Sequence, residues 1–197
     1  CRAPGEAEAA VAEAMERGAF GGAGRRILVE EYLEGEEVSV LALVDGRRAA
    51  LLPSAQDHKR AYDGDRGPNT GGMGAYSPAP FETPEFQALV RDTVFAPTLR
   101  ELARRGIDYR GVLYAGLMLT AGGPKVLEFN CRFGDPETQA ILPRIRGDLI
   151  PLLEACIEGA LPADAVACSP EACACVVMAA EGYPGSVRKG DAIAGLE

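Results

Sequence analysis

A stretch in the second half of the chain, Lys125–Glu137, combines residue types that can bind phosphate groups and metal ions. We interpret it as a strand that runs into a proline-containing turn. Successive side chains then project to opposite faces, with Val126, Glu128, Asn130 and Arg132 on one face and Leu127, Phe129 and Cys131 on the other. The carboxylate and the amide oxygen can hold a hard divalent cation, and the guanidinium can bind a phosphate beside it. The alternative, with equal weight on these residues alone, is an edge strand whose polar face meets only water.

Residues 56–78 form the longest segment without apolar periodicity. A loop of this length inside a compact domain is usually functional or disordered. The segment mixes tyrosine, methionine and histidine with glycines that allow close approach of a ligand, which is not the composition of a disordered linker. His58, Lys59, Arg60 and Arg66 make it the most cationic part of an acidic chain. We therefore favour a lid or wall for an anionic substrate over a simple linker.

Residues 30–37 crowd five glutamates around a turn. Like charges at this density must face water or groups that donate hydrogen bonds, such as a ribose diol or an adenine amino group. On spacing alone, a solvated acidic turn is the favoured interpretation.

Composition limits the class of protein. The chain has 197 residues, 47% of them hydrophobic and 25% charged, which is enough for one large domain or one and a fraction. With 20 basic and 29 acidic residues, its net charge of −9 argues against a broad surface for nucleic acid or anionic membranes. No apolar run approaches the roughly 20 residues that a membrane helix needs, and no signal-like segment opens the sequence. We interpret the protein as cytoplasmic.

The six cysteines contain no C-x-x-C pair, and His58 is the only histidine. A zinc site would have to consist almost entirely of thiolates. We interpret the cysteines as small apolar core residues in a reducing compartment.

The elements that must position these groups are of mixed type. The first helix is expected at Ala7–Arg17, and a glycine-rich connector follows it. A helix is expected to begin at Thr83-Pro84, run towards Gly106 and bend at Pro97, and another to run from Leu149 to Glu158 between an Asp148 cap and Gly159. Strands are expected at Ile27–Leu33, Glu37–Val44, Arg47–Leu52, Gly111–Leu119, from Lys125 onward and at Glu171–Ala180. The fold class is therefore α+β, an antiparallel sheet with packed helices, with one domain over residues 1–165 and the beginning of a small C-terminal domain over residues 166–197.

Three segments, taken together, resemble one enzyme family. They are residues 30–39, residues 56–78 and residues 127–139, the last with the pattern Leu-Glu-Phe-Asn-x-Arg-Phe-Gly-Asp-Pro-Glu-Thr-Gln. This combination resembles the phosphoribosylamine–glycine ligases of purine biosynthesis, which belong to the ATP-grasp enzymes. The first segment and the Glu-x-Asn-x-Arg pattern are general to ATP-grasp enzymes, whereas residues 57–74 and 132–137 are far more specific. Residues 182–190 resemble the start of the small C-terminal domain of that family.

The resemblance implies an ATP-grasp lobe and a reaction in which ATP, glycine and phosphoribosylamine give glycinamide ribonucleotide through a glycyl phosphate. It implies Mg²⁺ or Mn²⁺ on Glu128 and Asn130, with Arg132 and Asp135 as catalytic residues. It places the nucleotide on Glu30, Glu31, Tyr32, Leu33 and Glu37. It places the phosphoribosyl substrate on Asp57, His58, Lys59, Arg66, Asn69, Thr70, Gly71 and Gly72.

Two departures from the family pattern lead to further expectations. Many ATP-grasp enzymes carry another metal carboxylate on the strand before the Glu-x-Asn strand, but residues 111–120 contain no Asp or Glu. The family also has an N-terminal domain and a first ATP-grasp lobe, with lysines that reach the phosphates, and neither is recognisable here. The alternatives kept open are a non-catalytic ATP-grasp fragment or binding module and an ATP-grasp ligase for another carboxylate.

We expect the 197-residue chain by itself to show little or no ligase turnover, because the phosphate-binding lysines are not among its residues. The measurement is ADP release with ATP, glycine and phosphoribosylamine. Product formation by this chain alone would contradict the expectation.

Overall fold

The computed structural model describes residues 1, 3–64, 66–162 and 165–195. The chain divides into two compact units, residues 1–33 and residues 34–197. The first unit contains α1 (Pro4–Val11), the π-helical turn η1 (Ala12–Glu16) and the 3₁₀ turn η2 (Gly21–Arg25). Residues 27–33 were predicted as a strand, and this is wrong. Leu28 and Val29 are 80% and 83% exposed, so this segment does not bury the apolar surface that would stabilise a strand.

The second unit is built on a four-stranded antiparallel sheet in the order β2-β1-β7-β8. Its strands are β1 (Glu36–Asp45), β2 (Ala49–Leu51), β7 (Arg110–Thr120) and β8 (Gly123–Asn130). The predicted hairpin after Asp45 and the return of the chain at residues 120–124 are both confirmed.

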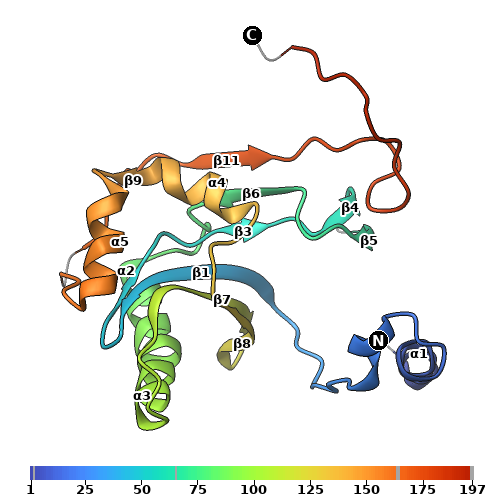
Figure 1. Cartoon of the computed structure of the whole chain (residues 1–197), viewed down its shortest axis with the longest axis horizontal. Coiled ribbons are helices and arrows are strands. Elements are labelled where there is room, and N and C mark those ends of the chain that lie inside the picture. The colour runs from blue at the N-terminus through green and yellow to red at the C-terminus, as the bar shows by residue number, and fades with distance from the viewer. Residues whose placement is uncertain (2, 65, 163–164, 196–197) are drawn as a thin grey trace. The chain divides into compact units, whose positions relative to one another are not determined.

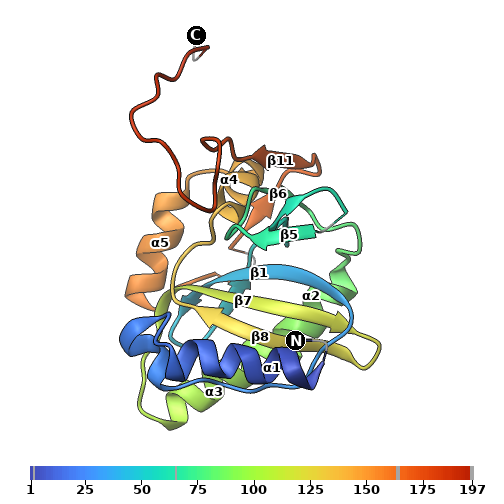
Figure 2. The same cartoon turned by 90° about the vertical axis from the view of Figure 1, so that its right-hand side faces the viewer.

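Helices cover one face of this sheet, as Figures 1 and 2 show. They are α2 (Pro84–Val90), the π-helical turn η3 (Arg91–Phe95) and α3 (Ala96–Arg104). The predicted cap is present, since Thr83 Oγ1 accepts a hydrogen bond from Phe86 N. The core on this face combines alternate residues of β1 and β7 with the helical apolar residues: Val38, Val40, Ala42, Val44, Leu113, Ala115, Leu117, Val90, Val94, Phe95 and Leu99.

A second layer covers the other face (Figures 1 and 2). It includes a three-stranded sheet, β11-β6-β3, made of β3 (Gln56–Asp57), β6 (Gly74–Ser77) and β11 (Cys173–Val176). It also includes α4 (Glu137–Ile141), the 3₁₀ turn η4 (Leu142–Arg144) and α5 (Leu149–Glu158). The α5 prediction is confirmed at both ends, with Asp148 Oδ1 accepting from Ile150 N at 2.9 Å and Gly159 at φ 74°.

The sequence predicted one long irregular loop at residues 56–78, and this is wrong. Besides β3 and β6, they form the hairpin β4 (Arg60–Tyr62) and β5 (Arg66–Asn69). These strands have only two to four residues each and are largely exposed in the hairpin, so they carry no apolar period. Residues 56–78, called the wall below, are therefore a set of short strands.

The C-terminal part pairs with earlier strands. The strand β10 (Ala167–Cys168) pairs with β9 (Ile145–Arg146), and β11 pairs with β6. The strand predicted at residues 171–180 is confirmed only over β11. The domain boundary after residue 165 stays a prediction.

The six cysteines are free thiols, and their environments differ. Cys156 is buried, which confirms its predicted role as a core residue. Cys1 and Cys131 are exposed, so the prediction of a core role is wrong for these two. Among the described residues, no helix is long and apolar enough to cross a membrane.

Asp45 provides a test of the fold at the turn from β1 to β2. Its carboxylate accepts hydrogen bonds from Arg47 N, Arg48 N and Leu161 N, at 2.9, 2.7 and 3.2 Å. Burial raises the pKa of this carboxyl, but the three N–H donors outweigh it, so the pKa lies below its usual value. The stabilisation is therefore present above pH ~4 and is lost as the pH falls through the lower, folded-state pKa.

We expect Asp45→Ala to lower the free energy of unfolding by about 2–3 kcal/mol at pH 7, because buried donors lose a charged acceptor. Urea titrations at pH 7 and pH 3 measure this, and the difference from wild type should shrink at pH 3. The control is Asp92→Ala, at a surface carboxylate whose side chain is 64% exposed. Equal losses for the two variants would contradict the assignment.

Candidate active site

The strand β8 carries Glu128 and Asn130 on one face, as predicted. Glu128 lies opposite Gly116 and Asn130 lies opposite Tyr114 in the β7–β8 register. Directly paired residues of antiparallel strands point to the same side, so both side chains share the Tyr114 face of the sheet. Asn130 Nδ2 donates to Glu128 Oε1 at 3.1 Å. The sequence correctly brought the carboxylate and the amide together.

The rest of the predicted polar face is wrong at Val126, and the strand ends before it reaches Arg132. The register shifts between Gly116 and Leu117, so Val126 pairs with Leu117 and points to the opposite face from Glu128. A β-bulge at Leu127 breaks the simple alternation. Arg132 lies beyond the end of β8 at Asn130, and its exposed guanidinium donates from Nη1 to Phe133 O at 2.8 Å. It therefore belongs to the loop before α4, and strand alternation does not apply to it.

Asp135 belongs to the same loop. Its Oδ1 accepts from Gln139 Nε2 at 2.7 Å, and Thr138 N donates to Gly134 O at 3.3 Å. These contacts join the loop to the first turn of α4.

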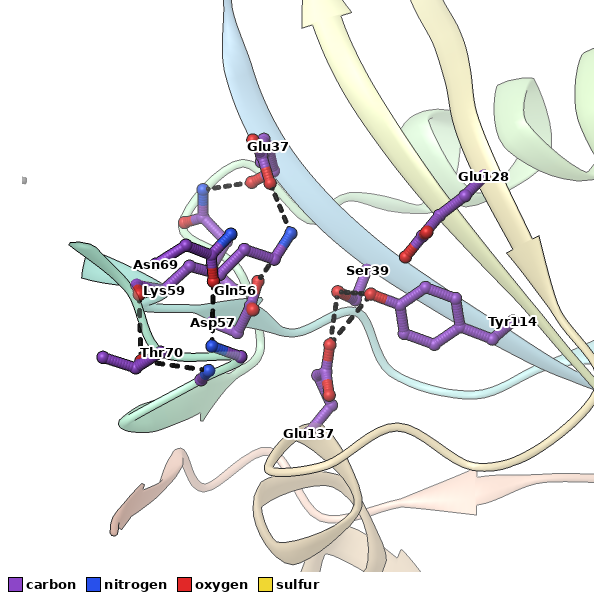
Figure 3. Close-up of polar contacts among 12 residues, drawn as sticks. Glu37, Ser39, Gln56, Asp57, Lys59, Asn69, Thr70, Tyr114, Glu128 and Glu137 are labelled. Atoms are coloured by element: carbon purple, nitrogen blue, oxygen red, sulfur yellow. Dashed lines mark hydrogen bonds and ion pairs between the residues drawn. The ribbon is translucent and has the colours of Figure 1, made fainter. Parts of the chain in front are cut away.

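A buried polar network that we did not predict lies beside β8 (Figure 3). Ser39 Oγ and Tyr114 OH lie 2.8 and 2.9 Å from Glu137 Oε1, and 2.8 Å from each other. The three residues are 2%, 5% and 3% exposed. Burial, the charge of Glu137 and the hydrogen bond to it raise the pKa of Tyr114, so its hydroxyl stays protonated and can donate. The sequence contained one signal, a serine two residues after Glu37 on the same strand face, but nothing marked Tyr114 within its apolar strand.

Two glycines make room for this network. A Cβ at Gly134 would lie 2.4 Å from Glu137 Oε2, and a Cβ at Gly116 would lie 3.3 Å from Glu128 Cγ and 3.5 Å from Tyr114 Cε1. The Tyr114 ring and the Glu128 side chain therefore use the space above Gly116. In Figure 3 the Glu128 carboxylate extends toward the Ser39 and Tyr114 hydroxyls.

Lys59 connects the wall to β1. Its Nζ lies 2.6 Å from Glu37 Oε2 and 3.8 Å from Asp57 Oδ1 (Figure 3). Burial lowers the pKa of Lys59, but the hydrogen bond to Glu37 and the charges of Asp57, Glu37 and Glu128 raise it by more, so the ammonium form is favoured. Asp57 has a side chain only 5% exposed, and burial, with the charges of Glu137 and Glu37, raises its pKa against the opposing effect of Lys59. The predicted residues Glu37, Asp57 and Lys59 are thus in contact.

The glycine-rich part of the wall is held by its own hydrogen bonds. Thr70 N donates to Lys59 O, Gly71 N to Asn69 Oδ1 and Gly72 N to Thr70 Oγ1, at 2.7, 2.8 and 3.2 Å. A phosphate cradle made of these amides would therefore require the exchange of internal bonds. Gly72, at φ 129°, packs so closely on the loop before α4 that a Cβ would lie 2.5 Å from Pro136 Cδ. The wall and the Asp135 loop meet at this point.

The other residues predicted to bind the nucleotide or the phosphoribosyl substrate have different surroundings. His58 packs on Tyr76 with ring centroids 5.6 Å apart, and Arg66 is exposed on β5. Glu30, Glu31, Tyr32 and Leu33 belong to the first unit, in a segment with neither helix nor strand. Their role as nucleotide ligands stays a prediction.

The donor set at β8 fits a hard cation that shares its coordination with phosphate. No group of three or more His, Cys, Asp or Glu residues that could hold a metal occurs in the described ranges. Mg²⁺ is typically bound by one or two protein oxygens, with water and substrate phosphates filling the other positions. One carboxylate and one amide side by side match that mode, with the Asn130 amide turned to present its oxygen.

A depression of about 450 Å³ lies elsewhere, between the turn after β1 and the ends of α3 and α5. None of the predicted site residues lines it, and its Arg110 is paired with Asp108 at 3.0 Å. The donor groups of β8 and the wall, and not this depression, make up the candidate site.

The electrostatic arrangement around Asp57 can be tested directly. We expect the Asp57 carboxyl to titrate above its usual pKa, Lys59→Met to raise that pKa further because a cation is lost, and Glu137→Gln to lower it because an anion is lost. Carboxyl-carbon NMR shifts followed against pH measure this, with the exposed Asp108 as the internal control. Shifts of Asp57 in the opposite directions would rule out the arrangement.

Comparison with known proteins adds a family to this geometry. The family model described as phosphoribosylglycinamide synthetase, ATP-grasp (A) domain, matches residues 1–138. A phosphoribosylamine–glycine ligase of Vigna unguiculata is 52% identical over 194 residues, which cover 98% of this chain and 62% of that protein. A trifunctional purine biosynthetic protein, adenosine-3, of Gallus gallus is 54% identical over 192 residues, 97% of this chain and 19% of that protein.

A solved structure of a phosphoribosylamine–glycine ligase also matches this chain. The crystal structure of phosphoribosylamine–glycine ligase from Thermotoga maritima matches with a TM-score of 0.73 and 40% identity, covering 82% of this chain and 40% of that one. The chain thus spans less than two thirds of the length of each of these relatives. The family match, the sequence identities and the fold agree, and this chain belongs to the phosphoribosylglycinamide synthetase family, with its ATP-grasp (A) domain over residues 1–138.

Proposed function

We propose that the protein takes part in the ATP-dependent ligation of glycine to 5-phosphoribosylamine, giving glycinamide ribonucleotide, ADP and phosphate. The observation that carries the proposal is the Glu128–Asn130 pair on one sheet face in a member of this family. The Lys59 wall and the Arg132–Asp135 loop support it, because they are the segments with the most specific resemblance to these ligases.

The reaction has two steps in this proposal. An oxygen of the glycine carboxylate attacks the γ-phosphorus of ATP, and ADP leaves. The amine nitrogen of phosphoribosylamine then attacks the carbonyl carbon of glycyl phosphate, inorganic phosphate leaves, and the nitrogen loses one proton. Both steps require little of the protein beyond positioning and neutralisation of charge.

Glu128 and Asn130 would hold Mg²⁺ or Mn²⁺, and the cation supplies neutralisation of phosphate charge when bound. Arg132 has an exposed guanidinium whose Nη1 donates to a backbone oxygen in its own loop, so it can turn to the transferring phosphoryl group. Asp135 acts from the same loop. These are the catalytic assignments.

Residues of the wall, together with Glu37, would bind the substrates. Glu37 would accept hydrogen bonds from ribose hydroxyls after giving up Lys59, and the released ammonium would then bind phosphate. Arg66, His58 and the segment Asn69–Gly72 would bind the phosphoribosyl group. Asp57 would bind an amine of a substrate, because its carboxylate is buried and lies 3.8 Å from Lys59, which is longer than a direct hydrogen bond.

We also propose that this reaction takes place in the cytoplasm with small-molecule partners and no nucleic acid or membrane partner. The free cysteines support a reducing compartment. The net charge of −9 supports the absence of a polyanionic partner.

The test uses the protein expressed from its complete open reading frame. We expect ADP release that depends on both glycine and phosphoribosylamine, and a loss of about 100-fold or more in kcat for Glu128→Ala, because a cation ligand is removed. The measurement is steady-state ADP release, with calorimetry of Mg-ATP binding alongside it. The matched control is Glu101→Ala on α3, where the carboxylate pairs with Arg104 and Arg105 at 2.7 Å on the surface, and it should leave kcat within about twofold.

Two results would contradict the proposal. ADP release with another amino acid or carboxylate, but not with glycine, would identify a different ligase. Absence of both turnover and Mg-ATP binding in the complete protein would favour a non-catalytic module.

A further inference from the structure

The Ser39–Tyr114–Glu137 network joins three separate parts of the second unit. Ser39 belongs to β1, Tyr114 to β7 and Glu137 to the first position of α4. All three are buried, and the oxygen–oxygen distances are 2.8–2.9 Å (Figure 3). A carboxylate this deeply buried is costly unless it is hydrogen-bonded, so the two hydroxyls determine where Glu137 can lie.

The network touches β8 on one side. Ser39 pairs with Gly116, and Gly116 pairs with Glu128, so these three residues form one row across β1, β7 and β8. Gly116 leaves open the space into which the Tyr114 ring and the Glu128 side chain fit. The hydroxyl of Tyr114 therefore reaches Glu137 from directly beside Glu128.

On its other side the network holds the loop that follows β8. The Glu137 carboxylate occupies the position that a side chain at Gly134 would take. The bonds from Thr138 N to Gly134 O and from Gln139 Nε2 to Asp135 Oδ1 make that loop continuous with α4. Anchoring Glu137 to the sheet therefore fixes the loop that contains Arg132 and Asp135.

The position of the wall also depends on Glu137, because the wall packs on the loop that Glu137 holds. Gly72 packs against Asp135 O and Pro136 Cδ, at 3.3 and 2.5 Å from the position of a Cβ. A shift of the loop would therefore also move the segment Asn69–Gly72. Three groups with proposed roles, the Glu128–Asn130 pair, the Arg132–Asp135 loop and the Asn69–Gly72 segment, thus meet around one buried carboxylate.

We propose that Glu137, held by Ser39 and Tyr114, is a positioning residue that sets the Arg132–Asp135 loop against the Glu128–Asn130 face. It acts by accepting hydrogen bonds at a fixed point and does not contact the reacting atoms. This inference rests on the proposed ligase function, since it assigns a role within that site.

The position of the Glu137 side chain and its negative charge can be tested separately. Glutamine has nearly the same shape as glutamate, and its Oε1 can still accept from both hydroxyls. Phenylalanine at position 114 keeps the ring and removes one donor, and alanine at position 39 removes the other. If the position of the Glu137 side chain matters, Glu137→Gln stays active. The double variant Ser39→Ala/Tyr114→Phe, which lacks both donors, then loses activity.

The experiment measures kcat and KM for Mg-ATP, together with Tm, for variants of the complete protein. We expect Tyr114→Phe to lower kcat about 10-fold and the double variant Ser39→Ala/Tyr114→Phe about 100-fold, with KM for Mg-ATP within about threefold, because small misplacements of catalytic groups have effects of this size. Glu137→Gln should keep kcat within about threefold. The matched control is Ser77→Ala, at a buried serine whose hydroxyl donates to Ser54 O at 2.7 Å and accepts from Arg144 Nη1 at 2.8 Å. It should lower Tm and leave kcat within about twofold.

Each other outcome overturns the inference in a recognisable way. A double variant with kcat within threefold of wild type shows that the network does not position the loop. A Glu137→Gln variant as inactive as the double variant shows that charge, and not hydrogen-bonded position, is required. A loss of kcat in Ser77→Ala in proportion to its loss of Tm shows a general effect of stability. Failure of the ligase proposal itself is distinguishable, because the wild-type protein would then show no turnover with glycine and phosphoribosylamine.

Discussion

The antiparallel pairing of β1, β7 and β8 is the constraint on which the site depends. It divides the side chains of the central strands between two faces, one packed on α2 and α3 and one lined by Glu37, Ser39, Tyr114, Glu128 and Asn130. Apolar burial on the first face stabilises the sheet. On the second face, Ser39, Tyr114 and Glu137 are buried together, and their mutual hydrogen bonds offset the desolvation of each.

The same face concentrates negative charge around one cation. Glu37 and Asp57 lie within 4 Å of the Lys59 ammonium, and the charge of Glu128 also acts on it. Glu137 adds to the effect of burial on Asp57. A region with this excess of carboxylates favours the entry of a divalent cation, and the cation in turn allows phosphate to approach. The charges around Lys59 thus suit a metal–phosphate pair better than a free anion.

Glycines decide how closely the segments of the candidate site approach one another. Gly134 admits the Glu137 carboxylate, Gly116 admits the Tyr114 ring, and Gly72 lets the wall pack on Pro136. A Cβ at Gly116 would also meet Glu128 on β8, a Cβ at Gly134 would meet the first residue of α4, and a Cβ at Gly72 would meet Pro136, which is distant in sequence. Close packing of this kind transmits a displacement of one segment to the next, and the positioning role proposed for Glu137 depends on this transmission.

The sequence by itself determined the types of element and brought Glu128 and Asn130 together on one strand face. Strongly periodic segments and explicit caps specify the helices α2, α3 and α5 and the strands β1, β7 and β8 locally, and Glu128 and Asn130 share a face because a strand alternates with a period of two. Only the tertiary structure decided where that alternation stops, since the bulge at Leu127 depends on pairing with β7. Only it placed Arg132 outside the strand, divided residues 56–78 into short strands, and brought Ser39, Tyr114 and Glu137 together. Contacts between residues 23 to 98 positions apart depend on how the layers pack, and no local pattern in the sequence encodes them.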